Sequence, residues 1–272
     1  MPNDRVVGTA QDKMSTAVAP NRISVTVADP VARLQLLNPP LNVIDLRMMD
    51  ELLVALEQIE ERSEVLAVVI SGCGQAFSAG VDIAAHTPDK VAAMLRKFHS
   101  AIRALVTTRK VTIAQVEGAC LGGGAEMAMV CDLVYTARDA SWGFPEIKLG
   151  CYPPVACAAL GALVGHKRAA ELILTGRQIS GDEALAIGLA TGAARSEELP
   201  ALVNDALERL RMLSPAALAL AKKAFYCWEA AHFEKGLARA EEIYLAELMK
   251  TEDANEGIRA WMEKRKPVWK GR

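Results

Sequence analysis

Two carboxylates stand in apolar surroundings, a placement that favours acid–base chemistry. Glu126 falls in the first turn of an apolar run, 125–130, that is expected to be helical, so its side chain should face inward. Glu146 lies between Pro145 and Ile147 in a stretch of aromatic and apolar residues. Burial raises the pKa of a carboxyl, so two such groups can act as an acid and a base near neutral pH. For Glu146 taken alone, a surface loop or a helix start is an equal alternative.

Three consecutive glycines, at positions 122–124, precede the Glu126 helix. Glycines at a helix N-terminus leave backbone N–H groups uncovered, and the helix dipole favours a developing anion there. An oxyanion hole is therefore one use of this segment. A tight turn with close helix–strand packing is the other, and the glycines alone do not decide between them. The lysine of a nucleotide-binding P-loop is absent here.

Two further small-residue segments could carry chemistry, and both depart from the motif they come nearest to. The glycines at 72 and 74 would need a third at position 77, which is Phe77, to form a dinucleotide fingerprint. Ser78 would need a glycine at position 76, which is Ala76, to form a nucleophile elbow. The segment at 76–80 can instead offer a second backbone N–H to an anion.

The elements around these residues alternate between strand and helix. The expected strands span 23–27, 31–37, 65–70, 111–116 and 133–136, and the expected helices between them span 46–59, 91–106 and 125–130. Such alternation predicts an α/β core. Beyond about residue 154 the strand signal disappears. The helices expected there span 167–174, 180–187, 199–213, 216–248 and 255–264.

Composition excludes several classes of protein. The chain has 272 residues, 51% hydrophobic, with a net charge of -2, so no overall positive field attracts nucleic acid or an anionic membrane. No run approaches the roughly 18 apolar residues of a membrane helix. Residues 1–20 have no apolar core of a secretory signal and are expected to form a flexible extension. We expect a cytoplasmic protein, and we expect the basic C-terminal residues 264–272 to be a solvated tail.

Cysteine and histidine spacing gives no sign of a metal centre. The six cysteines include no C-x-x-C pair, and the four histidines are isolated from one another. Reduced thiols and no metal are therefore the expectation.

Four segments taken together closely resemble the crotonase (enoyl-CoA hydratase/isomerase) superfamily. They span residues 74–83, 117–126, 131–133 and 144–150, and they occur in the family's order. The resemblance runs from about residue 22 to the C-terminus. It implies a spiral core of ββα turns over 21–200 and a C-terminal helical trimerisation region over 201–272. It also implies a homotrimer or a hexamer of two trimers, and no cofactor apart from the coenzyme A of an acyl-CoA substrate.

The resemblance also implies roles for particular residues. The backbone N–H groups of Val81 and Gly123 match the oxyanion hole that holds the thioester oxygen. Glu126 and Glu146 match the two acids of the hydratase branch, which position a water and move its protons; isomerases of the family commonly keep only one. The coenzyme A contacts fall, by resemblance alone, on Val43, Ala79, Asp82 and Ile83.

One segment departs from the straight-chain hydratases, which usually continue after the second acid with a threonine, Ile-Pro and several glycines. This chain has Cys-Tyr-Pro-Pro-Val-Ala-Cys at 151–157. Together with residues 39–45, it is similar to the cyclohexa-1,5-diene-1-carbonyl-CoA hydratases of anaerobic aromatic degradation. A stiffer, bulkier wall suits a cyclic or branched acyl group. A double-bond isomerase and a non-catalytic acyl-CoA-binding subunit remain the alternatives to a hydratase.

Overall fold

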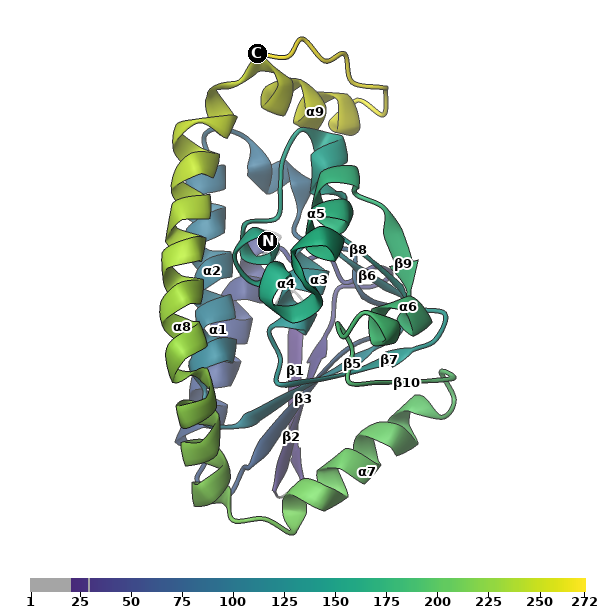
Figure 1. Cartoon of the computed structure of the whole chain (residues 1–272), viewed down its shortest axis with the longest axis vertical. Helices are drawn as coiled ribbons and strands as arrows, with labels where there is room; N and C mark the ends of the chain where they lie inside the picture. The colour runs from purple at the N-terminus through teal and green to yellow at the C-terminus, as the bar shows by residue number, and fades with distance from the viewer. Residues whose placement is uncertain (1–20, 29) are drawn as a thin grey trace, which may run out of the picture.

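The computed structural model describes residues 21–28 and 30–272 (Figure 1). The expected extension at 1–20 lies outside the described residues. Two sheets form the centre of the molecule. The larger has the order β1-β2-β3-β5-β7-β10, and every neighbouring pair in it is parallel except β1 and β2. Its strands are β1 (Ile23–Ala28), β2 (Val31–Leu36), β3 (Ala67–Gly72), β5 (Val111–Val116), β7 (Leu133–Ala137) and β10 (Gly192–Ala194).

The smaller sheet has the order β4-β6-β8-β9, in which only β8 and β9 are antiparallel. Its strands are β4 (Ala76–Ser78), β6 (Ala119–Leu121), β8 (Ser141–Gly143) and β9 (Gln178–Ser180). The chain contributes one strand to each sheet in succession, as β3 then β4, β5 then β6, and β7 then β8, and each pair is followed by a helix. This repetition confirms the predicted spiral of ββα turns.

Nine α-helices and three short 3-10 helices cover the sheets in the described residues. The α-helices are α1 (Leu46–Glu61), α2 (Val91–Thr107), α3 (Gly123–Met129), α4 (Pro154–Val164), α5 (His166–Thr175), α6 (Gly181–Ala186), α7 (Leu199–Arg211), α8 (Pro215–Ala246) and α9 (Glu252–Met262). The 3-10 helices are η1 (Ile83–His86), η2 (Pro145–Leu149) and η3 (Leu248–Lys250).

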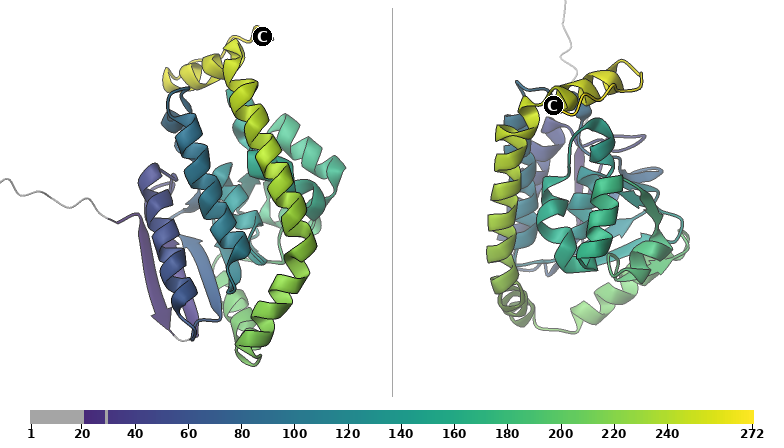
Figure 2. Two further views of the ribbon diagram at one scale, coloured as in Figure 1. Left: turned by 90° about the vertical axis from the view of Figure 1, so that its left-hand side faces the viewer. Right: turned by 45° about the horizontal axis from the view of Figure 1, so that its top comes forward.

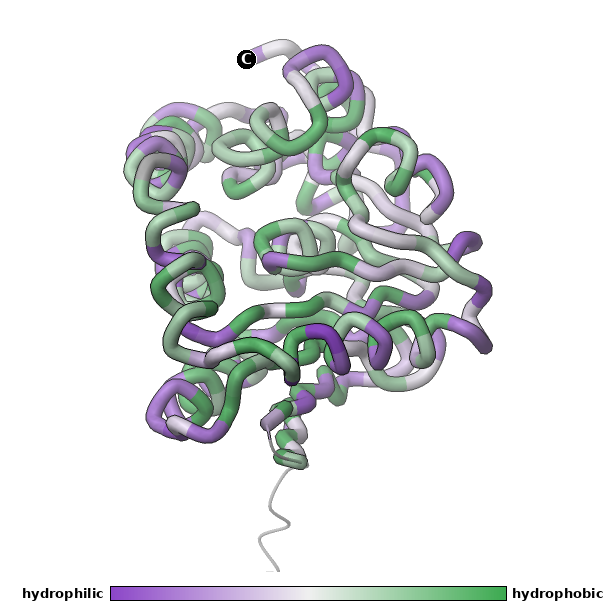
Figure 3. The backbone as a smooth tube through the Cα atoms, turned by 60° about the horizontal axis from the view of Figure 1, so that its bottom comes forward, coloured by the Kyte–Doolittle hydropathy of each residue, from purple (hydrophilic) through white to green (hydrophobic). Residues whose placement is uncertain are grey.

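Local sequence explains these elements. The run at 67–70 in β3 is continuously apolar because both faces of this strand are covered, and its residues are at most 1% exposed. Helix α1 begins where the Asp45 carboxylate accepts a hydrogen bond from the Met48 N–H, and its apolar stripe faces the core. Figure 3 shows hydrophilic segments mainly in the turns at the periphery.

The expectation that strands end near residue 154 is wrong, because β9 and β10 lie beyond it. The three-residue strands β4, β6 and β8, and helix α4, were also not predicted. A strand of three residues is too short to show a period of two. Helix α4 was not predicted because its residues are apolar on all sides and show no amphipathic stripe.

The C-terminal helices lie against the spiral. The long helix α8 runs down one side of the molecule and packs on α4 and α2 (Figures 1 and 2). Helix α9 packs on η1 and η2. The tail after α9 is exposed, as expected of a solvated tail, and it also folds back so that the Glu252 N–H donates to the Arg272 carbonyl at 2.8 Å. Arg265 and Lys270 of this tail pair with Glu256 and Glu252 of α9.

All six cysteines lie in the described residues, and all are free thiols. No helix in the described part of the chain combines the length and the apolar character that crossing a bilayer would require.

Candidate active site

Three neighbouring strands of the smaller sheet run parallel and end side by side. Ser78 of β4 is paired with Cys120 of β6, and Leu121 of β6 is paired with Gly143 of β8. The segments that follow these strands therefore leave the sheet at one edge. They are 79–83, 122–126 and 144–149, which carry most of the residues that the sequence singles out. The smaller sheet thus positions the candidate site.

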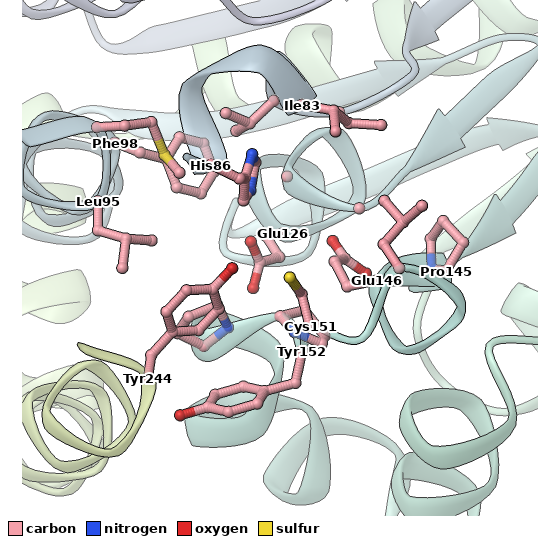
Figure 4. A pocket seen from close by; sticks show the side chains of 18 of the residues that line it. Ile83, His86, Leu95, Phe98, Glu126, Pro145, Glu146, Cys151, Tyr152 and Tyr244 are labelled. Atoms are coloured by element: carbon pink, nitrogen blue, oxygen red, sulfur yellow. The ribbon is translucent and has the colours of Figure 1, made fainter. Parts of the chain in front are cut away.

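A cavity of about 90 Å³ lies at this edge (Figure 4). Six of the eight site residues expected from the sequence line it: Ala79, Val81, Ile83, Gly123, Glu126 and Glu146. The remaining wall comes from η1 and η2, from the 151–154 segment, from α2 and from the C-terminal helices. Its members are His86, Met94, Leu95, Phe98, Leu149, Cys151, Tyr152, Pro153, Pro154, Tyr244 and Ile258, with Gly80, Gly122 and Pro145 between the motif residues.

The backbone N–H groups of Val81 and Gly123 lie next to each other at the cavity. A Cβ placed on Gly123 would be 3.4 Å from the Val81 nitrogen, and one placed on Gly80 would be 3.4 Å from the Gly123 nitrogen. The residues flanking Val81 pair with Ile44, at 2.9 and 3.0 Å, which leaves the Val81 N–H unused. The Gly123 N–H opens α3 and has no intrahelical acceptor. Within the described residues neither group donates to a protein acceptor.

Glycine is required at two of the turns that create this arrangement. Gly80 has φ +102° and Gly122 has φ +52°, both in the region that favours glycine. A Cβ on Gly122 would also lie 2.5 Å from Glu146 Oε1, so that glycine makes room for the carboxyl. The glycines at 122–124 therefore do more than allow close packing: they leave space for the Glu146 carboxyl and keep the Gly123 N–H open to the cavity.

Glu126 is held at the first turn of another helix. Its Oε1 accepts hydrogen bonds from the N–H groups of Val155 at 2.8 Å and Ala156 at 3.0 Å, which begin α4. The side chain is buried, and this burial raises its pKa to about 7 although the two bonds act in the opposite direction. Glu126 therefore caps α4 with one oxygen and is fixed in orientation.

Glu146 is placed differently. It lies in the first turn of η2, and its Oε2 is buried without a hydrogen-bond partner in the described structure. Burial raises the pKa of this carboxyl well above its ordinary range, and the nearby charge of Glu126 raises it further. Of the two alternatives considered for Glu146, the helix start is matched, since the residue lies in the first turn of η2, and the surface loop is not, since its carboxyl faces this cavity (Figure 4).

The pair can therefore share protons near neutral pH. Two like charges in one low-dielectric site resist simultaneous ionisation, so one carboxyl tends to be protonated while the other is charged. An acid, a base and two free N–H donors then face one cavity. Such a set can stabilise an oxyanion and move protons at a neighbouring carbon.

Two of the expected site residues do not line the cavity. The Val43 carbonyl accepts a hydrogen bond from Asn38 Nδ2 at 2.7 Å, and the Asp82 carboxylate caps η1 by accepting from the Ala84 N–H at 3.0 Å. Asp82 lies between the lining residues Val81 and Ile83, and Val43 precedes Ile44, which pairs with Val81. The contact of Val43 and Asp82 with coenzyme A stays a prediction.

Of the cavity wall outside the motif segments, the sequence analysis located one part and missed another. The segment at 151–154, singled out for its departure from the family pattern, lines the cavity. Phe98, Tyr244 and Ile258 were not singled out. Each sits in a helix remote in sequence from the motifs and looks there like an ordinary core residue, so no local signal marks it.

No group of three or more histidine, cysteine or carboxylate side chains is arranged to hold a metal ion in residues 21–28 and 30–272.

Comparison with known proteins identifies relatives over almost the whole chain. Residues 26–272 match the profile of the family described as enoyl-CoA hydratase/isomerase. The chain is 34% identical over 259 residues to a cyclohexa-1,5-dienecarbonyl-CoA hydratase of Thauera aromatica, covering 95% of this chain and 100% of that one. It is 37% identical over 257 residues to a probable enoyl-CoA hydratase of Bacillus subtilis, covering 92% and 99%.

Solved structures agree with this match. A crystal structure of an enoyl-CoA hydratase from Mycobacterium avium subsp. paratuberculosis superposes with a TM-score of 0.83 at 28% identity. The superposition covers 92% of this chain and 100% of the other.

Proposed function

The chain belongs to the enoyl-CoA hydratase/isomerase family and is an enzyme of the enoyl-CoA hydratase type, and from that premise we propose that Glu126 and Glu146 add water to the conjugated double bond of an acyl-CoA. The observation that carries the proposal is the meeting of both carboxyls with the two free N–H groups at one cavity. Coenzyme A enters as part of the substrate, and the proposal includes no other cofactor.

The thioester oxygen would accept hydrogen bonds from the N–H groups of Val81 and Gly123. Addition of water at the β-carbon turns the thioester into an enolate, and these donors are already oriented where the negative charge develops. Each such donor can contribute about 3 kcal/mol to the transition state. The side chain at position 81 has no part in this role.

The two carboxyls would handle the water. The ionised one takes a proton from the water as its oxygen attacks the β-carbon, and the protonated one delivers a proton to the α-carbon. The raised pKa values support this division, since one group is then an acid and the other a base near neutral pH. Double-bond isomerisation needs only one proton-transferring acid, so the presence of two favours hydration.

We further propose a cyclic dienoyl group as the acyl part, within aromatic degradation. The rigid wall at 151–154 and the Thauera aromatica relative support this choice. The cavity of about 90 Å³ is smaller than the roughly 150 Å³ that accommodates benzene in an engineered protein core. Binding of a ring would therefore require side chains such as Leu95 or Ile258 to move outward.

The test is to give the purified protein crotonyl-CoA and cyclohexa-1,5-diene-1-carbonyl-CoA in parallel, in water enriched in oxygen-18. The expected product is heavier by one labelled water, with higher kcat/KM for the cyclic substrate. Preference for crotonyl-CoA would overturn the cyclic assignment and retain the hydratase. A shifted double bond without oxygen-18 would replace hydration by isomerisation, and no product from either would point to an acyl-CoA-binding subunit.

Assembly into a trimer or a hexamer is proposed on the exposed apolar residues near and within the N-terminal half of α8. Leu220 is 67% exposed and Phe225 is 73% exposed, and Met212 just before the helix is 86% exposed. Contiguous apolar residues of this kind commonly mark an interface. We also expect the protein to lie in the cytoplasm. Analytical sedimentation of the purified protein would show a trimer or a multiple of three.

A further inference from the structure

Tyr244 brings a hydroxyl into the cavity that has no partner in the described structure. The residue comes from α8 and is only 1% exposed, so its oxygen is withdrawn from bulk water. Its Oη finds no partner of good hydrogen-bond geometry in the described residues, and the group within reach is the thiol of Cys151, which is a weak partner. In Figure 4 the hydroxyl points into the cavity on the side of Glu126. A buried polar group of this kind calls for a partner.

The neighbouring Tyr152 shows what a satisfied hydroxyl looks like at the same wall. Its ring meets the ring of Tyr244 edge to face at 5.1 Å, and both residues line the cavity. The Tyr152 hydroxyl donates to the Ala240 carbonyl of α8 at 2.7 Å. Of these two tyrosines, one uses its hydroxyl to hold α8 and the other leaves its hydroxyl facing the substrate space.

A second unpaired oxygen faces the same space. Glu146 Oε2 is buried and has no partner in the described structure, so two open hydrogen-bonding positions of opposite character share one cavity. A carboxyl oxygen can accept a hydrogen bond whether the group is ionised or carries its proton on the other oxygen, whereas burial raises the pKa of Tyr244 and keeps its phenol protonated as a donor. One ligand hydroxyl can satisfy both, by accepting from Tyr244 and donating to Glu146.

We propose that Tyr244 is a specificity-determining residue, whose phenol donates a hydrogen bond to a hydroxyl oxygen of the ligand lodged between Tyr244 Oη and Glu146 Oε2. The inference rests on the proposed function insofar as the ligand is an acyl-CoA. The hydroxyl has two possible sources. It is either the one delivered by the added water, at carbon 3 of the acyl chain, or a substituent that the substrate already carries, at carbon 4.

Three ligands separate these sources: butyryl-CoA, 3-hydroxybutyryl-CoA and 4-hydroxybutyryl-CoA. Their affinities are measured by calorimetry in a Glu126→Gln background, which stops turnover of the 3-hydroxy compound while the amide oxygen still accepts from α4. The two ligands without a 3-hydroxyl are measured again with Glu126 intact. We expect one hydroxylated ligand to bind about 10-fold or more tighter than butyryl-CoA, the discrimination that a single buried hydrogen bond provides.

Tyr244→Phe should then abolish this discrimination and leave the affinity for butyryl-CoA within about 3-fold, because the ring packing on Tyr152 is kept. A preference for the 3-hydroxy ligand assigns the oxygen to the added water, and a preference for the 4-hydroxy ligand assigns it to a substituent. Equal binding of all three ligands, or discrimination that survives Tyr244→Phe, overturns the proposal.

Tyr152→Phe is the matched control. It removes a hydroxyl from the same wall, but one already bonded to Ala240, so it should change all three affinities by a common factor and keep their ratio. Thermal unfolding of each variant verifies that it is folded. Because binding needs no catalysis, these results stand apart from the oxygen-18 assay: failure to hydrate any enoyl-CoA would remove the proposed function without deciding the role of Tyr244.

Discussion

The cavity has two walls of different construction. The motif wall, formed by the lining residues of the segments 79–83 and 122–126 and by Glu146, is held by backbone geometry. It has glycines at positive φ and a carboxyl anchored on a helix N-terminus. The helical wall, formed by Phe98, Tyr244 and Ile258, is held by side-chain packing of α2, α8 and α9.

The difference indicates a division of labour. Backbone donors and anchored carboxyls cannot shift without rebuilding the turns that hold them, so they suit chemistry that demands fixed geometry. Packed side chains can be exchanged at modest cost, so they suit the choice of acyl group. Changes in the motif wall should therefore act on kcat, and changes in the helical wall should act on KM and on substrate preference.

The largest effect is expected from Glu146→Gln. The amide keeps the size of the side chain but cannot exchange a proton, so kcat for the preferred enoyl-CoA should fall by about 10²- to 10⁴-fold. Acyl-CoA binding, measured by calorimetry, should stay within a few-fold. Glu57→Gln, on the exposed side of α1, is the control for loss of one negative charge. Full activity of the Glu146 variant would exclude the two-acid mechanism.

Gly123→Ala tests the backbone of the motif wall. The added methyl would lie 2.7 Å from Val81 Cγ2 and 3.2 Å from Phe98 Cζ, so the Val81 side chain must shift, and it would lie beside the Val81 nitrogen at 3.4 Å. We expect kcat to fall by about 10²-fold, the effect of losing one oxyanion donor, with little change in KM. Gly161→Ala in α4 is the matched control, because its methyl would meet His166 at an ordinary 3.6 Å. Equal loss in both variants would remove the special position of Gly123.

Glu126, the anchored carboxyl of the motif wall, should lower the unfolding free energy of the protein at high pH. Burial raises the pKa of Glu126 to about 7, so the folded protein holds a proton that the unfolded chain releases above its ordinary value of 4.5. The contribution of Glu126 to the unfolding free energy therefore falls as pH rises from 4.5 to 7 and is constant above that range. Glu126→Gln lacks this proton, and its amide oxygen can still accept from α4.

The difference in unfolding free energy between Glu126→Gln and the wild type should thus grow with pH, in favour of the variant, by up to about 3 kcal/mol. Urea unfolding at pH 5 and pH 8 measures it, with Glu57→Gln as the control for charge. A variant that loses stability relative to the wild type as pH rises would show that the fold favours the ionised carboxyl. A site that destabilises its own fold is typical of catalytic residues.

The sequence predicted the motif wall far better than the helical wall. Residues 79–83 and 122–126 are contiguous segments whose glycines and acids are conspicuous by type, and the register of β4, β6 and β8 brings them together. Those three strands were themselves not predicted, because three residues show no periodicity. The larger sheet was predicted where runs such as the one in β3 are long and apolar.

The helical wall depends on how distant helices pack, which local patterns do not encode. Tyr244 lies in a helix of 32 residues with no single apolar face, so nothing in its neighbourhood distinguishes a cavity residue from a core residue. The pairing of the tail with α9 was missed for a similar reason. The basic residues of the tail are exposed as expected, but the local pattern does not show which acids of α9 they meet.

Ile258→Val is the mildest change and the sharpest test of the division between the walls. Ile258 of α9 is 3% exposed and lines the cavity, and the substitution removes one methylene from the helical wall. The unfolding free energy should fall by about 0.5–1.5 kcal/mol. The lost contact should raise KM for crotonyl-CoA by less than about 10-fold at unchanged kcat, and the added space should lower KM for the cyclic dienoyl-CoA.

Ile179→Val in β9, equally buried but away from the cavity, controls for stability alone. It should match the loss of unfolding free energy and leave both KM values unchanged. If Ile258→Val instead lowered kcat for both substrates as strongly as Gly123→Ala, α9 would be acting on the chemistry through η2, against which it packs and which carries Glu146. The two walls would then form one rigid unit, and substrate choice could not be altered without cost to the reaction.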